Sequence, residues 1–196
     1  MHLFTLYLAL MLFVSTSSST ELGSTFGMGI EYGGQSIGSY EFSDGTTKDI
    51  KSNEGTIIYG GISYSFNNKY YIKTVGGTKF KSIIQKNEYI LFKRYLLELN
   101  LQRKIGKHYL GIGPIAHILP KFNCDMAAPC SSNSYEHAFG LAVQYEYKLP
   151  TEITDKNYLT MALRYTYIDY KLDIYKGNPS SLSANGIGLI VNMYYY

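Results

Sequence analysis

Residues 185–196 read Asn185-Gly-Ile-Gly-Leu-Ile-Val-Asn-Met-Tyr-Tyr-Tyr196, and the fold prediction rests first on their pattern. One set of alternate positions is large and apolar or aromatic throughout: Ile187, Leu189, Val191, Met193 and Tyr195. The other set begins with two glycines, includes Asn192, and is mostly small or polar. Alternation with a period of two is the pattern of a β-strand whose faces meet different surroundings. The stretch therefore predicts a strand with one apolar face and one small or polar face.

Seven further runs of the chain alternate in the same way. They cover residues 24–34, 56–66, 69–79, 88–102, 108–118, 136–148 and 157–168. Runs of this length suit a tilted transmembrane strand of about 9–11 residues better than a usual globular strand of about 5–6. Pro114 interrupts the fifth run, and because proline cannot donate a ladder hydrogen bond, we expect a bulge or an unpaired position there.

The connections between these runs alternate in length. Long segments at 35–55, 80–87, 119–135 and 169–184 alternate with short turns at 67–68, 103–107 and 149–156. This order predicts an all-β fold, an eight-stranded antiparallel up-and-down transmembrane β-barrel over residues 21–196. Aromatic residues near the strand ends are expected to form girdles at the membrane interfaces. They are Tyr32, Phe66, Tyr70, Tyr145, Tyr147, Tyr165, Tyr167, Tyr194, Tyr195 and Tyr196.

Residues 1–20 are predicted to be a cleavable signal peptide. The apolar run at 3–14 is too short for a membrane-spanning helix, which needs about 20 residues, and small hydroxyl residues follow it. The segment carries His2 but no Lys or Arg, and no Ala-x-Ala marks a cut, so the cleavage site is left open between 17 and 20. A buried N-terminal strand or helix is the alternative.

Composition excludes several classes of protein. The formal net charge of +3 is too mild and too dispersed for a nucleic-acid-binding protein. After residue 20 no stretch reaches 18 consecutive apolar residues, so no transmembrane helix is predicted. A membrane location therefore requires a closed barrel, because lipid satisfies no backbone hydrogen bonds.

The polar face of the runs is expected to line the barrel interior, which eight strands leave just wide enough for side chains. Charges there must be paired, because an unpaired buried ion costs several kcal/mol. We predict that Lys73 pairs with Glu98 and that Arg164 reaches Glu31 or Glu146. If the assignment of inward and outward positions is shifted by one residue, some of these groups lie at the rims of the barrel instead. The whole predicted inward set is Glu31, Lys73, Glu98, Asn100, Gln102, Gln144, Glu146 and Arg164.

The two cysteines, Cys124 and Cys130, lie six residues apart in a predicted loop. An exported protein meets oxidising conditions, so we expect them to form a short-loop disulfide. Two free thiols are the alternative. A metal site is not expected, since two cysteines without a nearby histidine do not complete one.

The signal peptide, the eight alternating runs, the lumenal Glu, Lys and Arg, and the terminal tyrosines resemble the small eight-stranded outer-membrane barrels. This porin-like family includes the transmembrane domain of outer membrane protein A, the OmpX-type proteins and the opacity-type surface antigens. The resemblance implies a monomer in the outer membrane of a Gram-negative bacterium, with four extracellular loops and no catalysis or cofactor. It implies a role in adhesion or envelope integrity, or at most a narrow ion path.

The same resemblance suggests which partners to expect. They are outer-membrane lipid, lipopolysaccharide and the barrel assembly machinery, which recognises a terminal aromatic residue. The loops at 35–55 and 119–135 are the best candidates for contact with a host or phage ligand. No nucleic acid is expected.

Two other functions remain as alternatives. A lipid A-modifying barrel enzyme would carry a His-x-Ser pair on one strand face, but none of the four histidines has Ser two residues on. A soluble, exported, lipocalin-like barrel would carry its large apolar residues inside. Here the large residues share the face that excludes Glu98, Glu146 and Arg164, so the pattern runs the other way.

Overall fold

The structure is a computed structural model that describes residues 21–66, 69–127, 130, 132–152, 157–171 and 181–196. The predicted signal peptide, residues 1–20, lies outside the described residues. No helix in the described part of the chain is long and apolar enough to cross a membrane.

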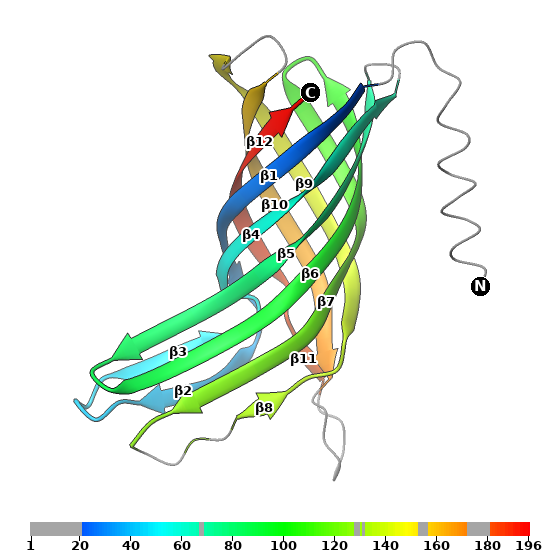
Figure 1. Cartoon of the computed structure of the whole chain (residues 1–196). Coiled ribbons are helices and arrows are strands. Elements are labelled where there is room, and N and C mark those ends of the chain that lie inside the picture. Colours follow the sequence, from blue (N-terminus) through cyan, green and yellow to red (C-terminus); the bar gives the residue numbers. More distant parts are fainter. Residues whose placement is uncertain (1–20, 67–68, 128–129, 131, 153–156, 172–180) are drawn as a thin grey trace.

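Eight long strands pair antiparallel, each with the next along the chain, and form a closed barrel (Figure 1). The barrel closes between the first and last strands, where Ser24 lies opposite Tyr195 and Gly33 lies opposite Gly186. The predicted eight-stranded up-and-down barrel is therefore confirmed. Its strands are β1 (Glu21–Gly33), β4 (Gly55–Phe66), β5 (Tyr70–Gln85), β6 (Glu88–Ile105), β7 (His108–Asp125), β9 (Ala138–Glu152), β10 (Tyr158–Lys171) and β12 (Gly186–Tyr195).

Four short strands lie at one end of the barrel, which we call the loop end (Figure 1). The strands β2 (Ser36–Glu41) and β3 (Thr47–Lys51) form a hairpin of their own. The strands β8 (Asn133–Ser134) and β11 (Ser181–Ser183) pair with β7 and β10. The opposite end, where β1 begins and β12 ends, is the turn end.

Several strands run further toward the loop end than the alternation predicts. The predicted loop at 80–87 is wrong, because β5 continues to Gln85 and pairs with Glu88 at the start of β6. In the same way β7 continues through 119–125, and the predicted loop at 35–55 contains the β2–β3 hairpin. In the β5–β6 extension the outward face carries Ser82 as well as the exposed Ile84 and Tyr89, so the alternation is hidden although the pairing goes on.

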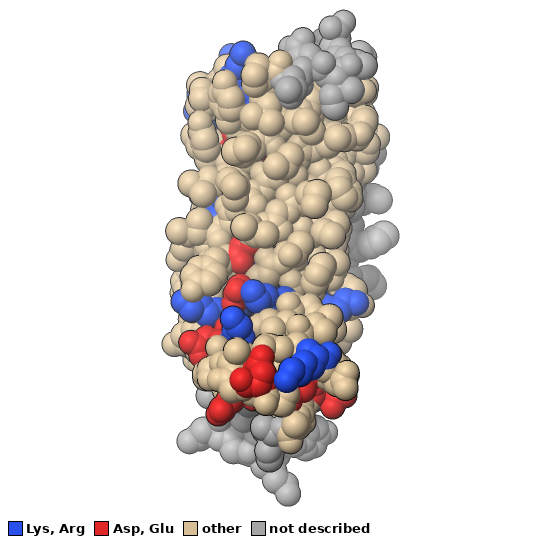
Figure 2. Space-filling view, turned by 90° about the vertical axis from the view of Figure 1, so that its left-hand side faces the viewer, with Lys and Arg blue, Asp and Glu red and all other residues tan. Residues whose placement is uncertain are grey.

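The two faces of the strands differ as predicted. In β12, Ile187 is 58 % exposed and Ile190 is fully buried. Outward-facing apolar residues surround the barrel, and Figure 2 shows a wall almost free of charge, with Lys, Arg, Asp and Glu gathered at the loop end. These exposed residues include Phe26, Met28, Ile30, Leu97, Leu99, Leu101, Ile112, Leu141, Val143, Leu163, Leu189 and Val191.

Pro114 lies where the ladder between β6 and β7 is interrupted. The registered pairs run from Glu98 opposite Ile115 to Leu101 opposite Ile112, with none assigned for the residues between. The register does not shift there, so Pro114 marks a position that is unpaired on the β6 side rather than a bulge, while on its other side it is registered with Leu141 of β9. The irregularity between these strands lies further on, between Lys93 and Tyr95.

The girdle predicted from the terminal tyrosines is partly wrong. Tyr195 faces outward and is exposed, but Tyr194 is buried inside the barrel, and Tyr196 packs against the same interior cluster. Both occupy the alternate positions of the last strand that face inward, and at the turn end the interior is filled by aromatic rings. The interior cluster consists of Tyr71, Tyr109, Tyr158 and Tyr194, with Tyr196 against it, and we call it the tyrosine floor.

Candidate functional site

The barrel interior holds the charged residues that the alternation places there. All eight predicted inward residues are buried, from Glu31 near the loop end to Glu146 near the turn end. Lys79 and Arg94 are fully buried as well, and the sequence analysis missed both. The alternation does predict their direction. Lys79 lies an even number of residues from Lys73 and therefore on the same, inward face of its strand, and the same holds for Arg94 and Glu98.

The first ionic group in the lumen centres on Arg164 of β10. Its Nε lies 3.0 Å from Glu31 Oε1 of β1, and its Nη1 lies 2.7 Å from Glu98 Oε2 of β6. Lys79 of β5 forms a second ion pair with Glu31 and donates a hydrogen bond to Asn53. Strands from opposite sides of the barrel are thus tied together across the lumen.

The second ionic group corrects the predicted pairing of Lys73 with Glu98. Lys73 Nζ lies 2.9 Å from Glu146 Oε1 of β9, while Glu98 is held by Arg164. Lys73 and Glu98 do lie on neighbouring strands, but Lys73 is registered with Asn100 and points across the lumen. In a barrel this narrow, a long side chain reaches a strand on the far wall as easily as its neighbour.

Glu146 is the most heavily hydrogen-bonded carboxylate in the lumen. Its oxygens accept hydrogen bonds from Thr160 Oγ1 at 2.7 Å and from Tyr194 OH at 2.9 Å. The amides of Gln102 and Gln144 each donate to it at 2.6 Å. A buried carboxylate with a counterion and four further donors is fully compensated, so the group acts as a structural crosslink.

The tyrosine floor closes the lumen below this group. Rings of Tyr158 and Tyr194 stack at a centroid distance of 5.0 Å, and those of Tyr71 and Tyr109 meet edge to face at 5.5 Å. Tyr196 stacks on Tyr158 at 6.1 Å and its hydroxyl lies 2.8 Å from Ser63 Oγ.

An aromatic core closes the lumen at the loop end. The β2–β3 hairpin contributes Phe42 and Ile50, both buried, to a cluster with Phe92 of β6, Phe122 of β7 and Tyr170 of β10. The rings of Phe92 and Tyr170 meet edge to face at 6.0 Å. Side chains therefore fill the interior from the aromatic core, through two ionic groups, to the tyrosine floor.

Arg94 differs from the other lumenal cations. Its guanidinium lies over the Phe92 ring at 4.5 Å, and Nη2 donates to the carbonyl of Glu54 at 3.3 Å. Its Nε and Nη1 have no hydrogen-bond partner among the described residues. This cation lies beside the ionic network without a carboxylate of its own.

Glu88 holds two loops together at the tip of the β5–β6 hairpin. Its Oε2 accepts the backbone N–H of Ser43 and its Oε1 accepts that of Ala127, both at 2.8 Å. These hydrogen bonds to the charged form lower the pKa of Glu88. Cys124 and Cys130 form a disulfide in the loop that contains Ala127, with Cα atoms 6.2 Å apart.

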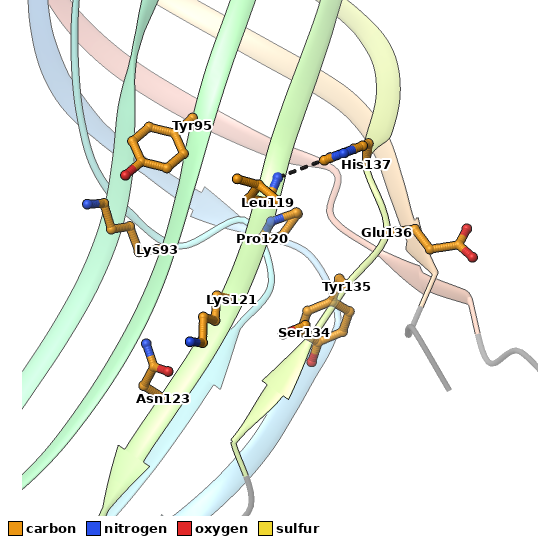
Figure 3. A pocket seen from close by; sticks show the side chains of 10 residues that line it. All are labelled: Lys93, Tyr95, Leu119, Pro120, Lys121, Asn123, Ser134, Tyr135, Glu136 and His137. Carbon is orange, nitrogen blue, oxygen red and sulfur yellow. Dashed lines mark hydrogen bonds between the residues drawn. The ribbon is translucent and has the colours of Figure 1, made fainter. Parts of the chain in front are cut away.

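An open groove of about 820 Å³ lies on the outer wall at the loop end, over β6, β7 and β8 (Figure 3). Ser134, Glu136 and His137 line it, a combination of residue types that serves in hydrolases. His137 Nδ1 accepts the backbone N–H of Leu119 at 3.2 Å, and Figure 3 shows the carboxylate of Glu136 pointing away from the ring. Among the described residues no hydrogen bond joins Ser134 to His137. The groove is lined by Lys93, Tyr95, Leu119, Pro120, Lys121, Asn123, Ser134, Tyr135, Glu136 and His137.

No family model and no curated protein sequence matches the chain. Its fold matches solved outer-membrane barrels. Neisserial surface protein A is 12 % identical, with a TM-score of 0.50 over 91 % of this chain and 99 % of that one. The outer membrane protein OprG from Pseudomonas aeruginosa is 16 % identical, with a TM-score of 0.55 over 90 % and 94 %.

A third similar structure is Ail, the attachment invasion locus protein of Yersinia pestis, solved in complex with the heparin analogue sucrose octasulfate. It is 13 % identical, with a TM-score of 0.50 over 90 % of this chain and 99 % of that one. At these identities the likeness concerns the fold. With the apolar belt around the barrel, it shows an integral membrane β-barrel of the outer-membrane type.

Proposed function

We propose that this protein is a non-catalytic surface protein in the outer membrane of a Gram-negative bacterium, and that its barrel is a closed anchor for its loops. One observation carries the proposal: side chains fill the lumen along its height, with buried ion pairs between layers of aromatic rings. A narrow ion path, which the sequence left open, is the less favoured function. The loop end then faces outward and the turn end faces the periplasm.

The filled lumen and the exposed apolar belt speak against the two alternatives. A soluble ligand-binding barrel needs an apolar cavity inside, whereas Lys73, Glu146 and Arg164 occupy the interior here. A lipid A-modifying enzyme needs an activated nucleophile. Among the described histidines, His117 bonds to Tyr170 and His108 to Tyr145, and His137 accepts a backbone N–H.

The expected partners belong to the same proposal. Lipid and lipopolysaccharide surround the belt, and the barrel assembly machinery inserts the chain after residues 1–20 are removed. The loops are available to a host or phage ligand, and the protein acts as a monomer without a cofactor. Adhesion fits the structure best, because the β2–β3 hairpin, β8 and the disulfide build an ordered surface beyond the membrane.

The test is the electrophoretic mobility of the outer-membrane fraction, boiled against unboiled. A closed barrel resists detergent until it is boiled, so we expect a heat-modifiable band in the outer membrane with an N-terminus between residues 18 and 21. Protease added to whole cells should cut at the loop end. A soluble periplasmic band without a mobility shift would overturn the proposal.

A further inference from the structure

Two lysines lie directly opposite each other on the outer wall. Lys93 of β6 is registered with Lys121 of β7 across an antiparallel ladder. Their neighbours along each strand, Phe92 and Phe122, are buried in the aromatic core, so both lysines face outward into the groove of Figure 3. Like charges at directly opposed positions repel each other and destabilise the pair.

No carboxylate in the described part of the chain neutralises this pair. No carboxylate of the described residues lies within ion-pair distance of either ammonium. Glu136 lines the same groove, but Figure 3 shows its carboxylate directed away from both lysines. The only charge-related contact of Lys93 among the described residues is with the Tyr95 ring, 4.9 Å from Nζ to the centroid. An anion from outside would complete the site.

The pair lies at the edge of the apolar belt. Below Lys93 on the same face of β6 come Tyr95 and Leu97, both exposed, and on the adjoining β9 Phe139 is 79 % exposed. Leu119, which lines the groove, is exposed too. Within the groove, apolar and aromatic groups thus lie on the membrane side of the lysines, and the polar groups of Asn123 and Ser134 lie on the solvent side. Further along β6, on the solvent side of Lys93, Tyr89 is exposed as well.

The backbone is distorted to produce this arrangement. The register between β6 and β7 shifts between Lys93 and Tyr95, opposite the segment of β7 in which Leu119 has a φ of 49°. A bulky residue at positive φ is strained, and bulges re-aim side chains next to binding sites. The extra residue carries Lys121 to the outward face beside Lys93.

We propose that this groove binds the phosphate of an anionic glycolipid of the lipopolysaccharide type in the outer leaflet. The two ammonium groups contact the phosphate, while Tyr95, Leu119 and Phe139 contact the first part of the acyl chains. The proposal rests on the proposed function, because it requires the loop end to lie in the outer leaflet. It commits to a membrane lipid rather than a soluble polyanion because the lysines adjoin the apolar belt.

The experiment uses the full barrel in detergent, freed of lipid, and native mass spectrometry with bis-phosphorylated lipid A as the probe. The test variant is Lys93→Gln with Lys121→Gln. The matched control is Lys48→Gln with Lys107→Gln, which removes the same charge at exposed positions away from the groove. We expect the test variant to bind about 10- to 30-fold more weakly than wild type, since each lysine near a lipid surface is worth about a factor of five. The control should bind like wild type.

Four outcomes separate the possibilities. Equal lipid A affinity in both double variants would overturn the lipid site while leaving the barrel proposal intact. Equal binding of dephosphorylated lipid A, or preferential binding of a soluble sulfated polysaccharide, would also overturn it. Absence of a heat-modifiable band in the wild-type protein would instead overturn the proposed function. If the double variant does not fold, Lys121→Gln alone, at an exposed position, should weaken binding about fivefold.

Discussion

At the scale of single residues, the lumen shows how buried ions are tolerated in a narrow barrel. Arg164 is shared by Glu31 and Glu98, and Glu146 combines one counterion with several hydrogen bonds. Removing one partner of such a group leaves the other as an uncompensated buried charge, which is far more costly than replacing the whole pair. The two kinds of buried cation in this lumen should therefore respond differently to mutation.

Arg164→Met and Arg94→Met provide a matched comparison. Arg164→Met leaves two buried carboxylates without their shared cation, and we expect a loss of roughly 3–5 kcal/mol in the free energy of unfolding. Arg94→Met removes a guanidinium whose Nε and Nη1 are unpartnered, so it should be neutral or stabilising. Urea unfolding of the refolded barrel in detergent, followed by the heat-modifiable band, measures both. Equal losses in the two variants would contradict this account.

We expect the link that Glu88 makes between two loops to depend on pH. Its folded pKa is lowered by the N–H groups of Ser43 and Ala127, so its contribution is complete above the unfolded pKa of about 4.3. The contribution is lost as the pH falls through the lower, folded pKa. Glu88→Gln should reduce hydrogen-exchange protection of both amides already at pH 7, whereas Glu41→Gln, at an exposed position of β2, should not.

Nuclear magnetic resonance in detergent micelles can follow the exchange of these two amides between pH 7 and pH 3. Wild-type protection factors should fall at the acid end, while those of Glu88→Gln should change little with pH. Unchanged protection in Glu88→Gln at pH 7 would mean that the carboxylate does not hold the loops.

At the scale of elements, the strands β5, β6 and β7 extend beyond the apolar belt toward the loop end and form a sheet there. The β2–β3 hairpin packs against the inner side of this sheet (Figure 1), and its buried Phe42 and Ile50 join the aromatic core. A two-stranded hairpin is marginal by itself, so its order depends on this packing. The hairpin should therefore detach separately from the barrel.

Phe42→Ala should release the hairpin without opening the barrel. A buried Phe→Ala substitution costs roughly 3–5 kcal/mol, more than the hairpin gains from its own hydrogen bonds. We expect proteolytic cleavage within residues 36–51 to accelerate while the heat-modifiable band persists. Lys48→Ala, at an exposed position of the same hairpin, serves as the control. Loss of the band in Phe42→Ala would show that hairpin and barrel fold as one unit.

At the scale of the whole molecule, the structure favours an anchor over a pore. Ion pairs tie strands on opposite walls, and aromatic groups close the interior at each end. Wild-type protein in planar lipid bilayers should therefore give no discrete conductance steps at 100 mV, under conditions where a wide porin opens readily. Reproducible single-channel steps from a homogeneous sample would contradict the closed lumen. The narrow ion path would then be the better-supported function.

The barrel is recognisable in the sequence for a physical reason that belongs to each strand alone. A wall between lipid and a filled interior forces a period of two, so the facing of Ile187, Arg164 or Glu146 can be read without knowing the neighbours. Where the outer surroundings change from lipid to water, this constraint ends. The extensions of β5 and β7 and the β2–β3 hairpin were missed at that boundary.

The number and order of the barrel strands, and which of their two faces most side chains occupy, thus follow from the sequence, although Lys79, Arg94 and Tyr194 had to be added to the lumen from the structure. Which of the lumenal residues contact one another depends on the packing of the whole barrel. Lys73 bonds to Glu146 rather than Glu98, and Tyr194 lies in the floor rather than in a girdle. Whether a side chain points inward or outward is a local property of one strand. Which side chains contact one another depends on the register of the strands, on the bulge near Lys93 and on the short distance across the barrel.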